Sequence, residues 1–284
     1  MNIQEQQFFC ERDGLKIRCR WYLPEGFSED HTYPAIIVSH GFTGNVFGGA
    51  EFCRGFANRG YVAVSFNFCG GGRVYEDESV KSEGASTDMS ILTEVQDLIA
   101  VKNYVKSQPF IDSNKIILQG LSQGGLVAAL TAARCGKEIY KLILGYPGFS
   151  IPYNARAGRM GGVTFDLEHV PDIVDCGKTI LSRKYFDAVV DMDPYKEAAL
   201  YQGPVLILQG LEDKTVDPSY SIRAKESYKE GQCQLVLIEG MGHGFDEQQR
   251  EMALGVIGEF LEKKFHQYPT DCIAPNSGAY ENKP

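Results

Sequence analysis

Apolar runs of strand length alternate with helical patterns along most of this chain. The apolar runs lie at 35–38, 61–67, 115–119, 141–145, 204–209 and 234–239. Helical patterns lie between or after them, at 51–59, 88–107, 125–133, 218–230 and 246–265. Continuous apolar runs are typical of strands that are covered on both faces. This order therefore predicts an α/β fold with a mostly parallel central sheet flanked by helices.

Three stretches depart from this alternation. Residues 7–10 and 16–22 read as an antiparallel hairpin that turns at Asp13-Gly14. Residues 148–198 contain glycines, prolines and mixed aromatics without a sheet pattern. We expect them to form a cap insertion over the site, with a plain surface excursion as the alternative. The core then comprises 1–147 and 199–266, and 267–284 is predicted to be a polar C-terminal tail.

Composition and charge exclude several classes of protein. The chain has 284 residues and a net charge of −9, with no basic run, so we expect no nucleic-acid partner. No apolar run has the length of a membrane span, and the N-terminus shows no signal-peptide pattern. Eight scattered cysteines without a Cys-x-x-Cys pair indicate neither a zinc site nor a redox pair. We therefore predict a cytoplasmic protein with reduced thiols and no membrane partner.

The most informative motif is the Gly-x-Ser-x-Gly sequence at 120–124, centred on Ser122. It follows an apolar strand and precedes a helix rich in small residues, which is the context of a nucleophile elbow. Glycines on either side of the serine permit a tight turn and close packing of strand and helix. In isolation the motif would read as an ordinary strand–helix turn. Its flanking elements favour Ser122 as a nucleophile.

Two later loops supply a base and an acid in the order expected after such a serine. His243 lies between glycines directly after the strand at 234–239, where its ring could accept the serine proton. Asp213, Glu212 and Asp217 compete for the role of the acid that orients this histidine. We favour Asp213, because Asp217 precedes a proline and is better placed to cap the next helix.

Two backbone amides are candidates for the oxyanion hole. One belongs to Gln123, the residue after the serine, and the other to Phe42, in the loop that follows the strand at 35–38. His40 opens the same loop. We interpret it as a residue that holds the loop in place, not as the base.

Several segments together resemble a known family. They are His40–Asn45, Ser65–Asn67, Asp88–Val95, Gly120–Gly125, Gly161–Phe165 and Gly240–His243. Over nearly its full length the chain resembles α/β hydrolases, and among these it is most similar to bacterial cinnamoyl/feruloyl esterases. The resemblance implies a serine esterase with Ser122, His243 and Asp213 as its catalytic triad. It also implies a small cap that receives an aromatic acyl group, with substrate contacts at Gly41, Thr43, Thr164 and Phe165.

The loop Asn67–Gly72 departs from this family pattern, because such esterases usually have Asn-Gly-His-Gly there. We expect the glycines of this loop to line the floor of the site, so the acyl preference stays open. The predicted reaction is acyl transfer from a small-molecule ester, without metal or organic cofactor.

Two other functions stay open. One is a serine peptidase of the same fold, although a chain of this length has no room for the large propeller that most such peptidases carry. The other is a non-catalytic receptor for a small molecule. The oligomeric state is also open, a homodimer included.

Overall fold

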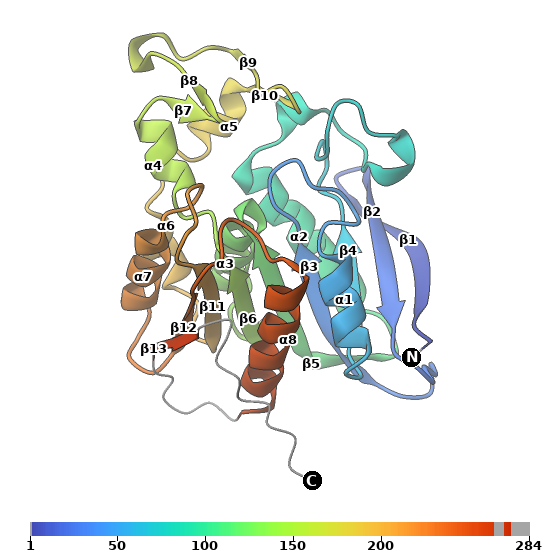
Figure 1. The fold of residues 1–284 in the computed structure, drawn as a ribbon. Coiled ribbons are helices and arrows are strands. Elements are labelled where there is room, and N and C mark those ends of the chain that lie inside the picture. The colour runs from blue at the N-terminus through green and yellow to red at the C-terminus, as the bar shows by residue number, and fades with distance from the viewer. Residues whose placement is uncertain (1, 264–269, 274–284) are drawn as a thin grey trace.

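The computed structural model describes residues 2–263 and 270–273. In this part of the chain nine strands form one sheet, in the order β1-β2-β4-β3-β5-β6-β11-β12-β13 (Figure 1). Their bounds are β1 Gln4–Arg12, β2 Leu15–Leu23, β3 Tyr33–Ser39, β4 Val62–Phe66, β5 Ile111–Leu121, β6 Lys141–Gly145, β11 Val205–Gly210, β12 Cys233–Ile238 and β13 Thr270–Ile273. The pairs of β2 with β1 and β4 are antiparallel, and the strands from β4 to β13 run parallel. The predicted fold class is confirmed.

Helices cover both faces of the sheet (Figure 1). Helices α1 (Ala50–Ala57) and α8 (Glu247–Glu262) pack on one face, where they bury Phe56, Leu254 and Phe260. Helices α2 (Ile91–Lys106), α3 (Gln123–Cys135) and α7 (Pro218–Ser227) pack on the other. Apolar side chains on both faces explain why the central strands read as continuous apolar runs.

The local sequence explains the turn between β1 and β2 and the position at which helix α2 begins. Asp13 and Gly14 join β1 to β2 with φ angles of 51° and 83°, as a tight hairpin turn of this type requires. Helix α2 begins at Ile91 and is capped by Ser90, whose hydroxyl accepts from the Thr93 amide. The helical pattern in the sequence predicted a start at residue 88. Asp88 instead ends a short 3-10 helix and forms an ion pair with Lys184.

The segment 148–198 builds small elements beyond the edge of the main sheet, at the top of Figure 1. They are α4 (Ile151–Arg156), the hairpin of β7 (Arg159–Met160) and β8 (Val163–Thr164), the hairpin of β9 (Ile173–Asp175) and β10 (Ile180–Ser182), and α5 (Arg183–Asp187). Helix α6 (Pro194–Ala198), the last element of the predicted insertion, packs against α3 and α7 and so lies with the core layer. We refer to 148–187 as the cap.

Short 3-10 helices lie in the connections, at Glu78–Val80, Ser86–Asp88, Gly136–Glu138 and Leu167–His169. Within the predicted polar tail, Thr270–Ile273 form β13, which pairs in parallel with β12. A four-residue strand is too short to show a pattern in the sequence. The rest of the predicted tail lies outside the described residues. Among the helices that are described, none combines the length and apolar character needed to cross a membrane.

Candidate active site

Ser122 occupies a strained turn between β5 and α3. Its φ of 53° and ψ of −121° are unusual for a residue with a side chain. A Cβ added to Gly120 would lie 2.1 Å from the Gly124 carbonyl oxygen, and one added to Gly124 would lie 2.4 Å from the His40 carbonyl oxygen. Both flanking positions therefore require glycine, as the motif predicted, and the turn presents the serine hydroxyl at the carboxyl edge of the sheet.

The structure brings Ser122, His243 and Asp213 into one hydrogen-bonded chain. His243 Nε2 lies 2.9 Å from Ser122 Oγ, and His243 Nδ1 lies 2.8 Å from Asp213 Oδ2. With Nδ1 protonated, the ring donates to the carboxylate and Nε2 is free to accept the serine proton. The T-shaped contact of His243 with the buried ring of Tyr146, at 4.8 Å between centroids, supports the imidazole from one side.

Asp213 is held by more than its histidine. Its Oδ1 accepts hydrogen bonds from the amides of Thr215 and Val216 at 2.8 and 2.9 Å, while Gln209 Nε2 donates to Oδ2 at 3.2 Å. The carboxylate is completely buried. These donors compensate the lost hydration of the negative charge and fix the direction from which the imidazole is oriented.

The two competing acids lie elsewhere. Asp217 is the N-cap of α7 and accepts from the Ser219 amide, as predicted, and this hydrogen bond lowers the pKa of Asp217. Glu212, which directly precedes Asp213 in the turn, is exposed to solvent. Only Asp213 of the three is bonded to His243 in the described part of the chain.

The two predicted oxyanion donors belong to backbone that flanks the nucleophile. Phe42 and Gln123 both line the cavity next to Ser122, and neither amide donates a hydrogen bond within the described part of the chain. A Cβ added to Gly41 would lie 3.1 Å from Ser122 Cβ, so the loop after β3 runs directly against the serine. Free amides on both sides of a serine are the arrangement that can bind a developing oxyanion.

His40 holds the loop after β3, as the sequence analysis expected. It is buried, its Nδ1 lies 2.8 Å from the Gly41 carbonyl oxygen, and its Nε2 lies 3.0 Å from the Asn67 side-chain amide. Burial lowers the pKa of His40, which favours the neutral ring. Because Phe42 follows two residues later, this anchoring also positions the Phe42 amide.

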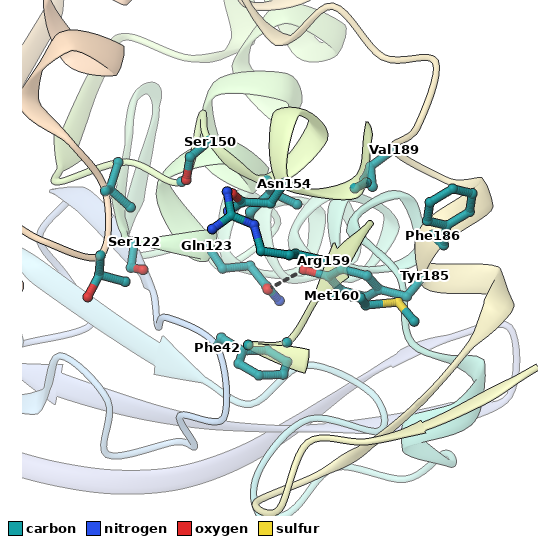
Figure 2. A pocket seen from close by; sticks show the side chains of 17 residues that line it. Phe42, Ser122, Gln123, Ser150, Asn154, Arg159, Met160, Tyr185, Phe186 and Val189 are labelled. Atoms are coloured by element: carbon teal, nitrogen blue, oxygen red, sulfur yellow. Dashed lines mark hydrogen bonds between the residues drawn. The ribbon is translucent and has the colours of Figure 1, made fainter. Parts of the chain in front are cut away.

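A cavity of about 160 Å³ opens beside Ser122, between the core and the cap (Figure 2). Phe42, Met160, Tyr185, Phe186 and Val189 give it an apolar wall. The polar side chains of Ser150, Asn154 and Arg159 also line it. Most of these residues come from α4, β7 and α5, in the irregular segment whose sequence showed no periodic pattern.

The side chain of Gln123 connects the cap to the core below the serine. Its Nε2 lies 2.8 Å from both carboxyl oxygens of Glu94. Its Oε1 accepts a hydrogen bond from the Tyr185 hydroxyl at 2.6 Å, which Figure 2 shows as a dashed line. Burial raises the pKa of Glu94 to about 8. Neither Glu94 nor Tyr185 was predicted as a site residue from the sequence. The one signal was a glutamate at a position that the α2 pattern turns toward the apolar core.

The four residues expected to contact substrate do not line this cavity. Gly41 lies directly against Ser122, and Thr43 adopts a left-handed conformation with φ of 59°. Thr164 is exposed on β8, and Phe165 packs edge-on against Phe186, 5.7 Å between centroids. Phe165 therefore supports a lining residue.

The glycine loop 69–72 also lies away from the cavity, contrary to expectation. Gly70, with φ of 72°, approaches the Ala85 backbone so closely that an added Cβ would lie 2.4 Å from its carbonyl oxygen. The loop is thus packed against the segment before α2. Its glycines serve this close approach.

In the described residues, one group of three side chains has the composition of a metal site: Asp166, Glu168 and His169. All three are exposed, and Asp166 already caps the short helix that carries the other two. The group lies outside the cavity lining, so it does not contribute to the chemistry at Ser122.

The model of the prolyl oligopeptidase family of peptidases matches residues 53–267, which include the serine, acid and histidine. The chain belongs to this family. Curated relatives from Escherichia coli are uncharacterised 31.7 kDa proteins of the traX-finO intergenic region, and one is 29% identical over 140 residues. That alignment covers 49% of this chain and 43% of the relative, so the chain spans less than half the length of the relative.

Solved structures of α/β hydrolases share the fold. Est1E from Butyrivibrio proteoclasticus, solved with ferulic acid bound, has a TM-score of 0.80 and 28% identity, over 89% of this chain and 97% of Est1E. A putative dipeptidyl aminopeptidase IV from Bacteroides ovatus has a TM-score of 0.66 and 18% identity, over 92% of this chain but 36% of that one. An acetyl xylan esterase from Paenibacillus sp. R4 also has a TM-score of 0.66 and 18% identity, over 92% of this chain and 89% of the esterase. The chain is therefore an α/β hydrolase with esterases among its structural neighbours.

Proposed function

We propose that the chain is a serine carboxylic-ester hydrolase that acts on small or aromatic esters, including those of the cinnamoyl and feruloyl type. The observation that carries this proposal is the hydrogen-bonded chain from Ser122 through His243 to Asp213, with two free backbone amides beside the serine. This arrangement supplies a nucleophile, a base, an orienting acid and an oxyanion hole.

The reaction proceeds in two halves. His243 Nε2 accepts the Ser122 proton as Oγ attacks the ester carbonyl carbon, and the amides of Phe42 and Gln123 stabilise the oxyanion. Collapse of the tetrahedral intermediate breaks the ester C–O bond, and His243 gives its proton to the departing alcohol. Water then attacks the acyl-enzyme in the same way, which releases the acid and frees Ser122. Asp213 stabilises the imidazolium ion in both halves.

The cavity restricts the substrate. Its volume of about 160 Å³ is well below the ~300 Å³ at which pockets for drug-sized ligands begin. It therefore suits an acyl group with about one ring or a short chain. Aromatic walls at Phe42, Tyr185 and Phe186 favour a planar apolar group, and Est1E, the neighbour with 28% identity, binds ferulic acid.

The test is hydrolysis of 4-nitrophenyl acetate and methyl ferulate by the purified protein and by Ser122→Ala. We expect both esters to be cleaved by the wild type and neither by the variant. Cleavage of 4-nitrophenyl acetate alone would contradict the preference for aromatic acyl groups but would still support an esterase. Turnover by Ser122→Ala equal to that of the wild type would contradict the role of the serine. Ligand binding by a wild type without turnover would favour a receptor.

The family supports a second candidate, a serine peptidase, because it is named for an oligopeptidase and a putative dipeptidyl aminopeptidase shares the fold. The same serine, histidine and acid would then attack an amide. An aminoacyl 4-nitroanilide, assayed beside the 4-nitrophenyl ester, distinguishes the two functions. Cleavage of the anilide at a rate close to that of the ester would favour the peptidase.

A further inference from the structure

Three polar side chains in the cavity have no partner inside the protein. The Ser150 hydroxyl, the Asn154 amide and the Arg159 guanidinium all line the cavity that contains Ser122. None of them forms a hydrogen bond or an ion pair within the described part of the chain, although Ser150 is only 4% exposed. Buried polar groups are usually hydrogen-bonded, which applies to Ser150, whereas Asn154 is half-buried and Arg159 is exposed. All three line one cavity without a partner in the protein, so a polar group of a ligand could bind to them together.

The charge of Arg159 is the most specific of these features. Other arginines of the cap are engaged: Arg156 donates to the carbonyl oxygens of Val190 and Met192, and Arg183 lies 3.6 Å from Asp187. Arg159 has no acidic group within 4.0 Å among the described residues, in a chain with 37 acidic side chains. Its strand, β7, presents it at the cavity, and Figure 2 shows the guanidinium directed toward the Ser122 end and away from Phe186. The lining of the cavity therefore includes an exposed positive charge that no acidic side chain of the described residues pairs with.

We propose that Arg159, Ser150 and Asn154 form a subsite for a carboxylate group. The preferred substrate is then the monoester of a small dicarboxylic acid, an inference that rests on the proposed ester hydrolysis. A guanidinium binds a carboxylate through two parallel hydrogen bonds, and the hydroxyl and amide add further donors. Met160, Phe186 and Val189 enclose the apolar body that links the carboxylate to the ester. The reaction remains hydrolysis, so the subsite adds affinity and orientation and no new chemical step.

The test uses two esters that differ only in the anionic group: the mono-4-nitrophenyl ester of adipic acid and 4-nitrophenyl hexanoate. Both have six-carbon acyl chains and the same leaving group. We expect wild-type kcat/KM to favour the adipate ester, and Arg159→Met to lower the ratio of the two kcat/KM values roughly 10- to 100-fold, the range for a hydrogen bond to a charged group. Arg159→Lys retains the charge and should keep part of the preference.

Arg183→Met is the matched control, because it removes one positive charge from the cap surface outside the cavity. It should keep the wild-type ratio, which separates a specific contact from general attraction of an anion. The subsite would be overturned if the wild type cleaved both esters equally well and Arg159→Met gave the same ratio of kcat/KM values. The proposed ester hydrolysis would be unaffected by that result.

A binding measurement decides the case in which neither ester is cleaved. Calorimetric titration of adipate and of hexanoate into the wild type and Arg159→Met does not depend on turnover. Adipate binding that weakens roughly 10-fold or more in Arg159→Met would support the subsite even if ester hydrolysis fails. Equal binding of adipate to both proteins, or no binding to either, would overturn it.

Discussion

Replacing Glu94 by glutamine should stabilise the protein, and the gain in free energy of unfolding over the wild type should increase as the pH rises. Glu94 is buried on α2, where the side chain of Gln123 donates to it, and the acidic Asp97 lies close enough to add to the rise of its pKa. Burial is the main cause that raises its pKa from 4.5 to about 8. Between these two values the folded protein retains a proton that the unfolded chain has released. Wild-type stability therefore falls with increasing pH across this window.

The magnitude follows from the same values. One pKa unit corresponds to about 1.4 kcal/mol, so the burial of Glu94 lowers the free energy of unfolding by about 2 kcal/mol at pH 6 and by roughly 4 to 5 kcal/mol above pH 8. Glutamine has no such proton to release. Titration of His40 is present in both proteins and cancels in their difference.

Equilibrium unfolding in urea at pH 5, 6, 7, 8 and 9 measures this difference. The stability of Glu94→Gln minus that of the wild type should rise by several kcal/mol from pH 5 to pH 8 and then level off. Glu226→Gln, which removes an exposed acid from α7, should give a flat difference curve. A flat curve for Glu94→Gln as well would refute the reasoning. It would mean that folding leaves the ionisation of Glu94 unchanged.

Four further substitutions test the site and the fold. Asp213→Asn should lower kcat about 1,000- to 10,000-fold, because the amide no longer holds the reactive tautomer of His243; ester kinetics with near-normal kcat would contradict this. Gly124→Ala should destabilise the protein by more than ~2 kcal/mol in urea unfolding, because the new Cβ meets the backbone of the loop after β3; wild-type stability would contradict it. Ser90→Ala should cost about 1 kcal/mol, whereas Asp88→Ala should cost less than half as much in the same assay.

The sequence predicted the parts of the fold that repeat a simple pattern. Apolar runs such as 35–38 and 204–209 are buried on both faces, so their hydrophobicity alone identifies them as central strands. The nucleophile turn was predictable for a related reason. A Cβ added to Gly120 or Gly124 would lie 2.1 or 2.4 Å from a backbone oxygen, so only glycine fits at either position, and the motif reflects that constraint.

The cap was predictable only as an irregular segment. Its helices and strands have two to six residues, too short to show a period, and its cavity lining depends on how those pieces fold over Ser122. Thr164 and Phe165 were expected in the site because they belong to a family-like stretch. In the structure Arg159 and Met160 of β7 line the cavity, whereas Thr164 of β8 is exposed and Phe165 packs against Phe186.

Gln123 connects the cap to the candidate oxyanion hole through a side chain that no sequence pattern singled out. The backbone amide of Gln123 is a candidate oxyanion donor, and its side chain is bonded to Glu94 on α2 and to Tyr185 on α5. Any movement of α5 that breaks the Tyr185 bond leaves a buried amide oxygen unpaired, which is costly. Position 123 is therefore fixed from the core and from the cap at once. This gives a physical reason to keep an acid buried at position 94, although it lowers the stability of the protein. The placement of an oxyanion donor affects the reaction rate more than a few kcal/mol of additional folding stability would.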